Sequence, residues 1–118
     1  MTTVKVTLEK GLKVGEVVHL EAEIREATAG DFIDASEESE RLCATPDGNY
    51  ALIASPSLVA IHILRRQIVR IGEYAGPLTL AEMKKLSGGD LGRIQVKAEE
   101  LDAAGVEKIA DRGRDTAA

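Results

Sequence analysis

The sequence predicts an α+β fold, in which an N-terminal antiparallel β-hairpin is followed by a small bundle of about four helices. Two early segments, residues 4–8 and 18–24, alternate apolar and polar side chains with the period of two that half-buried strands show. The later apolar segments instead have three- and four-residue spacing and begin with helix-capping residues. Strands followed by a run of helices are typical of an α+β domain.

The chain has the length of one domain. With 118 residues and 44% hydrophobic content, it is long enough to bury a core of its own. Aromatic residues make up only 3% of the chain, so that core must be aliphatic. We expect one domain over residues 1–104, with the hairpin at 3–25 and the helical part at 28–104, followed by a partly disordered tail at 105–118.

Composition argues against several classes of function. The net charge of −5 disfavours general binding to nucleic acid or to an anionic membrane. The single cysteine, Cys43, allows neither an internal disulfide nor a cysteine-based metal cluster. The N-terminus lacks the layout of a signal peptide, and no apolar run is long enough for a membrane helix. We therefore expect a soluble cytoplasmic protein.

The hairpin is the first predicted element. Its two alternating segments are joined by residues 10–15, a connection bounded by glycines. A lone hairpin is only marginally stable in water, so its apolar face must pack against helices or against another copy of the chain.

The first helix is predicted over residues 29–42. Thr28 is placed to accept from the N–H of Asp31, whose carboxylate lies in the first turn, where the helix dipole favours an acid. Residues 45–49 form a loop by their turn-forming composition. Residues 50–54 are expected to begin a further helical turn.

The central element is an apolar helix predicted over residues 55–72. Ser55 fits the N-cap, Pro56 the first helical position, and Gly72 the position just past the end. Apolar side chains recur at three- and four-residue steps, namely Leu58, Ile61, Leu64, Ile68 and Ile71, and Val59, Ile63 and Val69 widen this apolar surface. A helix that is apolar nearly all round belongs in a core or against a partner.

Two capping signals predict the last helices. Thr79 and Glu82 form a capping box before a short helix at 80–86. Ser87 and Asp90 repeat the pattern, with Asp90 in the role of the glutamate, before a helix at 88–103.

One charged stripe is a candidate site. His62, Arg66 and Arg70 follow at four-residue steps, so they share one side of the predicted central helix. They either bind an anion or an acidic partner, or they form a solvated rim that complements the acidic residues 34–40. The second interpretation is favoured, because charged stripes usually face water or one another.

No pattern of residues supports catalysis. Neither histidine has a partner at metal-binding spacing, and Ser57 has no histidine or acid at a telling distance. Gly88 and Gly89 lack the lysine that completes a phosphate-binding loop, so a plain helix start is the better interpretation. The sequence therefore predicts a binding protein that is not an enzyme and that uses no cofactor or metal.

Two stretches resemble a known family. Residues 21–34 read Glu-Ala-Glu-Ile-Arg-Glu-Ala-Thr-Ala-Gly-Asp-Phe-Ile-Asp, and residues 86–91 read Leu-Ser-Gly-Gly-Asp-Leu. They resemble Mu-like phage tail assembly proteins, in which a strand ending in Arg-Glu precedes a Thr-Gly-Asp-type helix start and a second helix begins at Asp-Leu. The resemblance covers most of residues 4–102. The chain departs from it at 72–86, which carry a capped short helix of their own.

The resemblance implies a tail assembly chaperone in the host cytoplasm. Such proteins are thought to bind the long helical tape measure protein before the tail tube forms, and a groove beside the central helix would suit that partner. The residues expected to face it are Val59, His62, Ile63, Arg66 and Arg70. A homo-oligomer is a second expected association. The alternatives are a structural tail component, retained in the virion as a ring or plug, and a small cytoplasmic regulator that binds another protein.

Overall fold

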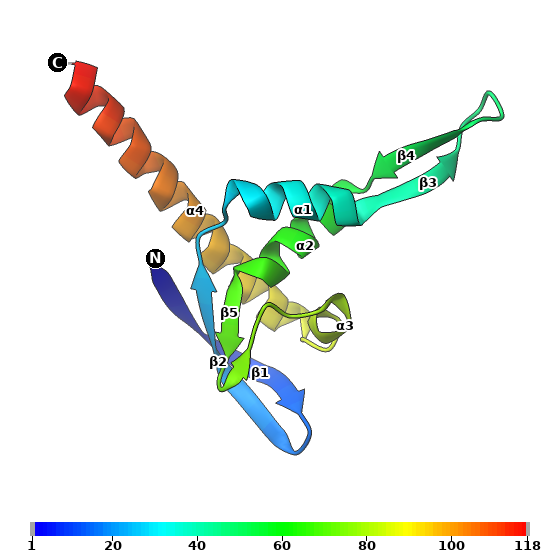
Figure 1. The fold of residues 1–118 in the computed structure, drawn as a ribbon. Coiled ribbons are helices and arrows are strands. Elements are labelled where there is room, and N and C mark those ends of the chain that lie inside the picture. Colours follow the sequence, from blue (N-terminus) through cyan, green and yellow to red (C-terminus); the bar gives the residue numbers. More distant parts are fainter. Residues whose placement is uncertain (1, 118) are drawn as a thin grey trace.

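The N-terminal hairpin forms half of a four-stranded antiparallel sheet (Figure 1). In the computed structural model, which describes the backbone of residues 2–117 and the side chains of residues 2–105, β1 (Thr3–Val14) pairs with β2 (Val17–Arg25). On the other side of β2 lies β5 (Ile68–Ile71), which pairs in turn with β6 (Tyr74–Ala75). The predicted hairpin and the α+β class are confirmed, but the sheet also includes two strands that the sequence analysis missed.

Four helices complete the domain (Figure 1). The helices α1 (Ala29–Ser39) and α2 (Pro56–Gln67) pack against each other, and α3 (Leu80–Met83) is a single turn beside α2. The long helix α4 (Gly88–Ala117) packs across β1 and β2. The number of helices is as predicted. The helices α1, α3 and α4 each contact α2, and α4 also packs on the sheet.

A second, two-stranded sheet projects from the domain as an arm (Figure 1). It consists of β3 (Glu40–Ala44) and β4 (Tyr50–Ala54). The prediction of a helix to residue 42 and of a helical turn at 50–54 is therefore wrong. The backbone becomes extended at Glu40, with φ −65° and ψ 134°, and an Asp-Gly turn at Gly48, with φ 84°, folds the chain back on itself.

The central helix is shorter than predicted. It begins as expected, with Pro56 in its first turn, but it ends at Gln67, and Ile68–Ile71 continue as the strand β5. Gly72 does not end the helix. It turns the chain from β5 into β6 with φ 59°, and a Cβ atom there would clash with the imidazole of His19.

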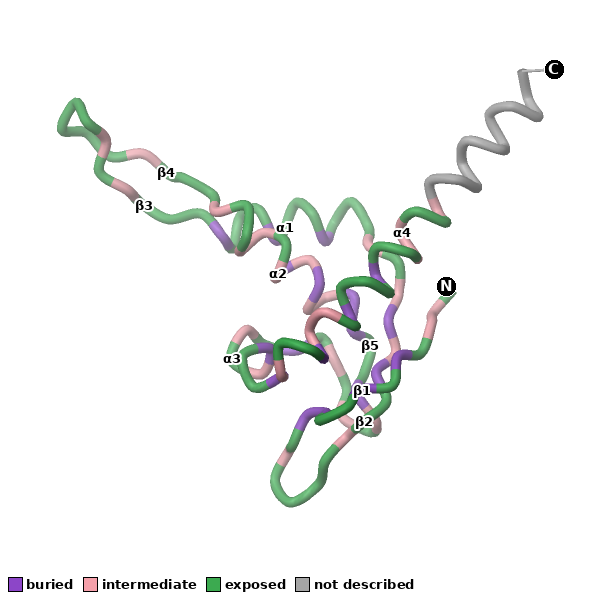
Figure 2. The backbone as a smooth tube through the Cα atoms, turned by 180° about the vertical axis from the view of Figure 1, so that it is seen from behind, coloured by how far each residue is buried: buried purple, intermediate pink, exposed green. Residues whose placement is uncertain are grey.

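The core is aliphatic, as predicted from composition. Its fully buried side chains come from the sheet, from the loop before α3 and from α4, namely Leu12, Ile24, Ile68, Ile71, Leu78 and Ile94. Figure 2 places the buried residues where α4 and α2 meet the sheet, whereas the arm is mostly exposed. Of the apolar stripe in the central segment, Leu64 and Ile68 join this core, while Leu58 and Ile61 remain half-buried.

A buried carboxylate joins α4 to the sheet. Between Thr7 and Leu12, β1 bulges away from the regular register. Asp90, which is fully buried, accepts from the bulge amides of Glu9 (2.7 Å), Lys10 (3.0 Å) and Gly11 (2.9 Å). The predicted cap at Ser87 is present, because the Asp90 N–H donates to its hydroxyl, but the carboxylate binds β1 and not its own helix end.

The start of α1 is capped as predicted. The Asp31 N–H donates to the Thr28 hydroxyl (3.2 Å), and the Thr28 N–H donates to the Asp31 carboxylate (2.8 Å). The same carboxylate receives two hydrogen bonds from Arg25, at 2.7 and 2.9 Å. These guanidinium bonds lower the pKa of Asp31 from 3.8 to about 2, although burial acts in the opposite direction.

The last helix extends beyond its predicted end near residue 103, since its backbone continues to Ala117. Side chains after Gly105 lie outside the described residues. The expected partial disorder of residues 105–118 stays a prediction.

The variant Asp90→Asn is expected to lower the free energy of unfolding by about 3 kcal/mol, because an amide cannot accept from all three bulge amides and leaves a buried donor unpaired. Chemical denaturation monitored by circular dichroism measures the loss. Glu99→Gln, an exposed acid on the same helix, is the matched control and should change stability by less than about 0.5 kcal/mol. Equal effects of the two variants would contradict this role of Asp90.

Acid should weaken the Arg25–Asp31 pair. Because the pKa of Asp31 is lower in the folded than in the unfolded chain, its contribution is complete above about pH 4 and is lost as the pH falls toward 2. The pKa difference corresponds to about 2 kcal/mol. The stability gap between wild type and Asp31→Asn should therefore shrink over that range. A constant gap for Asp31→Asn would be evidence against this assignment.

Candidate docking surfaces

Part of the predicted charged stripe is engaged within the chain. Glu38 on α1 accepts from Arg65 and Arg66 on α2, and its carboxylate lies 3.1 Å from the His62 Nδ1 atom. His62 is 8% exposed and also receives a hydrogen bond from the Arg65 Nε atom (3.0 Å). These groups hold α1 against α2, which is the arrangement that the rim interpretation of the stripe expects.

The two kinds of charge in this cluster influence each other. Burial lowers the pKa of His62, and the positive charge of Arg65 adds to the effect, while Glu38 acts in the opposite direction. Burial by itself would raise the pKa of Glu38, but the two guanidinium groups outweigh it, so that the pKa is lowered. The cluster at neutral pH is therefore an ionised glutamate with two arginines and a neutral histidine.

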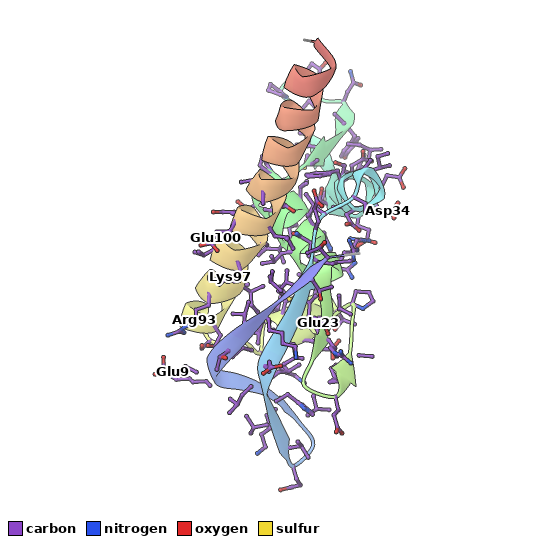
Figure 3. All side chains as sticks on the ribbon, turned by 90° about the vertical axis from the view of Figure 1, so that its left-hand side faces the viewer. Glu9, Glu23, Asp34, Arg93, Lys97 and Glu100 are labelled. Carbon is purple, nitrogen blue, oxygen red and sulfur yellow. The ribbon has the colours of Figure 1, made fainter. Side chains whose placement is uncertain are left out.

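Arg70 does not belong to the same helix. It lies on β5, where its Nε atom donates to the Glu23 carboxylate on β2 at 2.6 Å. Figure 3 places Glu23 on the sheet, away from Asp34 on α1. The structure thus separates Arg70 from His62 and Arg66, because the predicted helix ends before residue 68.

The other two predicted residues, Val59 and Ile63, are half-buried on α2. Ile63 lies in a groove of about 180 Å³ between α1, α2 and α4, which we call the α1 groove. Its lining residues are Phe32, Ala60, Ile63, Leu64, Gln67, Gln95, Ala98, Glu99 and Asp102. Sequence spacing on α2 pointed toward this surface, but Phe32 and the α4 residues reach it only through the tertiary fold.

A second groove lies between α2, α3 and α4. We call it the α3 groove; its volume is about 330 Å³. Its lining residues are Arg41, Leu58, Ile61, Leu80, Met83, Lys84 and Leu91. Five of these seven side chains are apolar, and the two polar ones are cations.

The arm carries the most exposed apolar residues among the described side chains. Leu42, Tyr50 and Leu52 are 68%, 70% and 66% exposed. Leu42 lies opposite Leu52 and Ala44 opposite Tyr50, so all four share one face of the ribbon. Large apolar side chains gathered on a protruding element mark a surface for protein association. This surface was not predicted, because residues on both sides of the turn were expected to be helical, although an Asp-Gly turn between apolar segments is a hairpin signal.

Charged residues along α4 make exposed ion pairs. Arg93 contacts Glu9 of β1 at 3.0 Å, and Lys97 contacts Glu100 at 3.4 Å (Figure 3). Arg93 and Lys97 line a hollow of about 560 Å³ between β1 and α4. Among the described residues, no group of three or more histidine, cysteine, aspartate or glutamate side chains is arranged to hold a metal ion.

The chain is thus a small α+β protein with exposed apolar surfaces. The family model described as "Tail assembly protein gp41" matches residues 8–114. The chain therefore belongs to the Mu tail assembly protein gp41 family.

Named relatives agree with this assignment. The chain is 42% identical over 114 residues to the Mu-like prophage FluMu protein gp41 of Haemophilus influenzae, covering 96% of this chain and 90% of the relative. It is 40% identical over 92 residues to the probable tail assembly protein gp41 of Escherichia phage Mu, covering 77% and 63%. Against the probable tail assembly protein FS-gp41 of the same phage, it is 42% identical over 81 residues, covering 69% and 43%. No solved structure matches the chain.

The predicted resemblance to Mu-like tail assembly proteins is thus confirmed, and the chain acts in phage tail assembly. None of the described helices combines the length and the apolar character needed to cross a membrane.

The Glu38 cluster leads to a prediction for the α1–α2 contact. Glu38→Gln should lower the free energy of unfolding by about 1 kcal/mol, because two arginines lose a partly exposed partner. It should also lower the pKa of His62 further, which an NMR titration of the imidazole measures. Glu37→Gln, the neighbouring exposed acid, is the control and should leave the His62 pKa in place. An unchanged His62 pKa in Glu38→Gln would show that the cluster does not form.

Proposed function

We propose that this protein is a non-enzymatic assembly chaperone, which binds and shields the tape measure protein in the host cytoplasm before the tail is built. The observation that carries the proposal is the apolar α1 groove beside the central helix. A tape measure segment is expected to be a long apolar helix that aggregates without a partner. A small protein with an open apolar groove protects such a helix by covering its exposed stripe.

The size and lining of the α1 groove favour helix side chains as its occupant. Its volume of about 180 Å³ is smaller than the roughly 300–1,000 Å³ of typical small-molecule pockets. Ala60 and Ala98 supply small apolar contacts that allow a helix to approach closely, and Leu64 adds apolar surface. Two aliphatic side chains of one helix, spaced by a turn, would fill this space.

The charges beside the groove favour a partner helix with basic flanks. Glu99 and Asp102 line the groove on the α4 side, and the exposed Asp34 and Glu37 lie on the neighbouring α1. Lysine and arginine side chains beside the apolar stripe of the partner would complement them, which aids both encounter and orientation.

The residues predicted to bind the partner divide into two roles under this proposal. Val59 and Ile63 contact the partner, together with Phe32 at the groove. Arg66 acts indirectly, since its ion pair with Glu38 holds α1 in position beside α2. His62 acts through Arg65, because it accepts a hydrogen bond from the guanidinium that also contacts Glu38. Arg70 stabilises the sheet through Glu23.

A second candidate is a structural tail component that forms a ring or plug and remains in the virion. The observation that favours it is the exposed apolar arm, which suits a permanent contact between subunits. Mass analysis of finished particles distinguishes the two functions, because a chaperone is absent or scarce in the virion.

Ala60→Glu tests the proposed site. Residue 60 is exposed and lines the groove, so the added charge should block an apolar helix while the fold is kept. We expect co-expressed tape measure protein to lose solubility and its affinity to fall roughly tenfold or more. Val59→Asp combined with Ile63→Asp should act in the same direction.

Ala104→Glu is the matched control, because Ala104 is an exposed alanine on α4 outside the groove lining. It should leave recovery of the soluble complex unchanged. If folded Ala60→Glu and the double variant both bind the tape measure protein as wild type does, the α1 groove is not its site.

A further inference from the structure

The arm lacks a second layer. Its two strands pair only with each other, and Leu42, Tyr50 and Leu52 on one face remain about two-thirds exposed. An isolated two-stranded hairpin is marginally stable in water, and three or more strands or a packed helix are needed to stabilise it. The arm requires such a contact in every folded copy of the protein. A partner that binds only late in assembly would leave it without one until then.

The α3 groove offers the complementary surface. Leu58, Ile61, Leu80 and Leu91 line it and are only half-buried. At its rim stands Lys84, which is exposed and, among the described residues, takes part in no ion pair within 4.0 Å.

The arm has an acidic tip that suits this rim. Asp47 lies in the turn between β3 and β4, where hydrogen bonds from Thr45 and Asn49 lower its pKa and keep it ionised. The described part of the chain shows no ion pair at Asp47 either. One chain therefore presents both an apolar ribbon with an acidic tip and an apolar groove with a basic rim.

The two surfaces do not meet within one copy. The arm leads outward from the ends of α1 and α2, away from α3, in both Figure 1 and Figure 2. Only its root, at Arg41, borders the α3 groove.

We propose that the arm of one copy packs the face formed by Leu42, Tyr50 and Leu52 into the α3 groove of a second copy, with Asp47 beside Lys84. The contact joins two different surfaces, so it repeats from copy to copy and builds a closed ring or an open chain. The outer edge of β1 suits a symmetric contact less well. Lys5 stands in the middle of its regular stretch, and pairing about that residue would place two lysines opposite each other. The proposal is independent of tape measure binding.

Complementation between two variants tests it. The arm variant Leu42→Asp with Leu52→Asp keeps an intact groove, and the groove variant Leu80→Asp with Lys84→Glu keeps an intact arm. Sedimentation equilibrium should find wild type in dimers and larger species, and each variant as a monomer, with the dissociation constant raised by about a hundredfold. An equimolar mixture of the two should form a one-to-one dimer, since one productive contact remains.

The matched control is Val17→Asp with Val18→Asp, which places charges on equally apolar, exposed residues at the tip of the other hairpin. It should assemble as wild type does. Wild type that stays monomeric at all concentrations would overturn the proposal, as would folded arm variants that keep the wild-type mass. The proposal would also be overturned if the arm variant no longer bound the tape measure protein but still self-associated, because the arm would then bind that partner.

A cross-linking experiment does not depend on the aspartate variants. The only cysteine, Cys43, lies on the arm but on the opposite face from Leu42, so it is replaced by serine in every variant. Asp47→Cys and Lys84→Cys then place one thiol at the tip of the arm and one at the rim of the neighbouring groove. Oxidation with copper phenanthroline should give a ladder of disulfide-linked oligomers from the chain that carries both new cysteines. A chain with only one of them should give no ladder. The absence of a ladder from the chain with both cysteines would contradict the arm-to-groove contact.

Discussion

The position of α4 depends on one buried carboxylate. Asp90 lies at the start of the helix and fills the bulge in β1, where three backbone amides would otherwise have no acceptor. Burying a charge is costly unless hydrogen bonds replace its water, and here both oxygens have amide donors. The bulge and the acid thus require each other. Together they place α4 across the hairpin, where Ile94 and Ala98 close the core over the sheet.

Other carboxylates join the helices to one another in the same way that Asp90 joins α4 to β1. Asp102 accepts from the Ala27 amide (3.0 Å) and from Gln67 (3.3 Å), so α4 is also tied to the start of α1 and the end of α2. Glu38 ties α1 to α2. The acidic character of the sequence is therefore partly structural, since carboxylates far apart in the chain each join two elements. These contacts fix the positions of the helices that line the apolar grooves beside α2.

Sequence patterns predicted the features that depend on residues close together in the chain. The hairpin, the Thr28 and Thr79 caps and the aliphatic core follow from local signals, and all are present. The ends of α1 and α2 were missed, because apolar residues at 42–43 and 68–71 fit helical spacing as well as strands. Contacts such as Glu38 with Arg66 or Asp90 with Glu9 join residues that are 28 and 81 positions apart. No spacing rule reaches that far, so the walls of the grooves could not be predicted from the sequence. The arm is a local hairpin, and its Asp-Gly turn did signal it.

The helix α2 is apolar nearly all round because three of its sides face apolar surroundings. Leu64 faces the core, Ile63 the α1 groove, and Leu58 and Ile61 the α3 groove. The two grooves differ in the charge of their polar lining, which includes Glu99 and Asp102 in one and Arg41 and Lys84 in the other. The charges beside the grooves favour different partners. A basic helix is attracted to the acidic residues of the α1 groove and repelled by the cations of the α3 groove. An acidic arm has the reverse preference. Under the two proposals above, one helix would contact the tape measure protein in one groove and a neighbouring subunit in the other, without competition for a site.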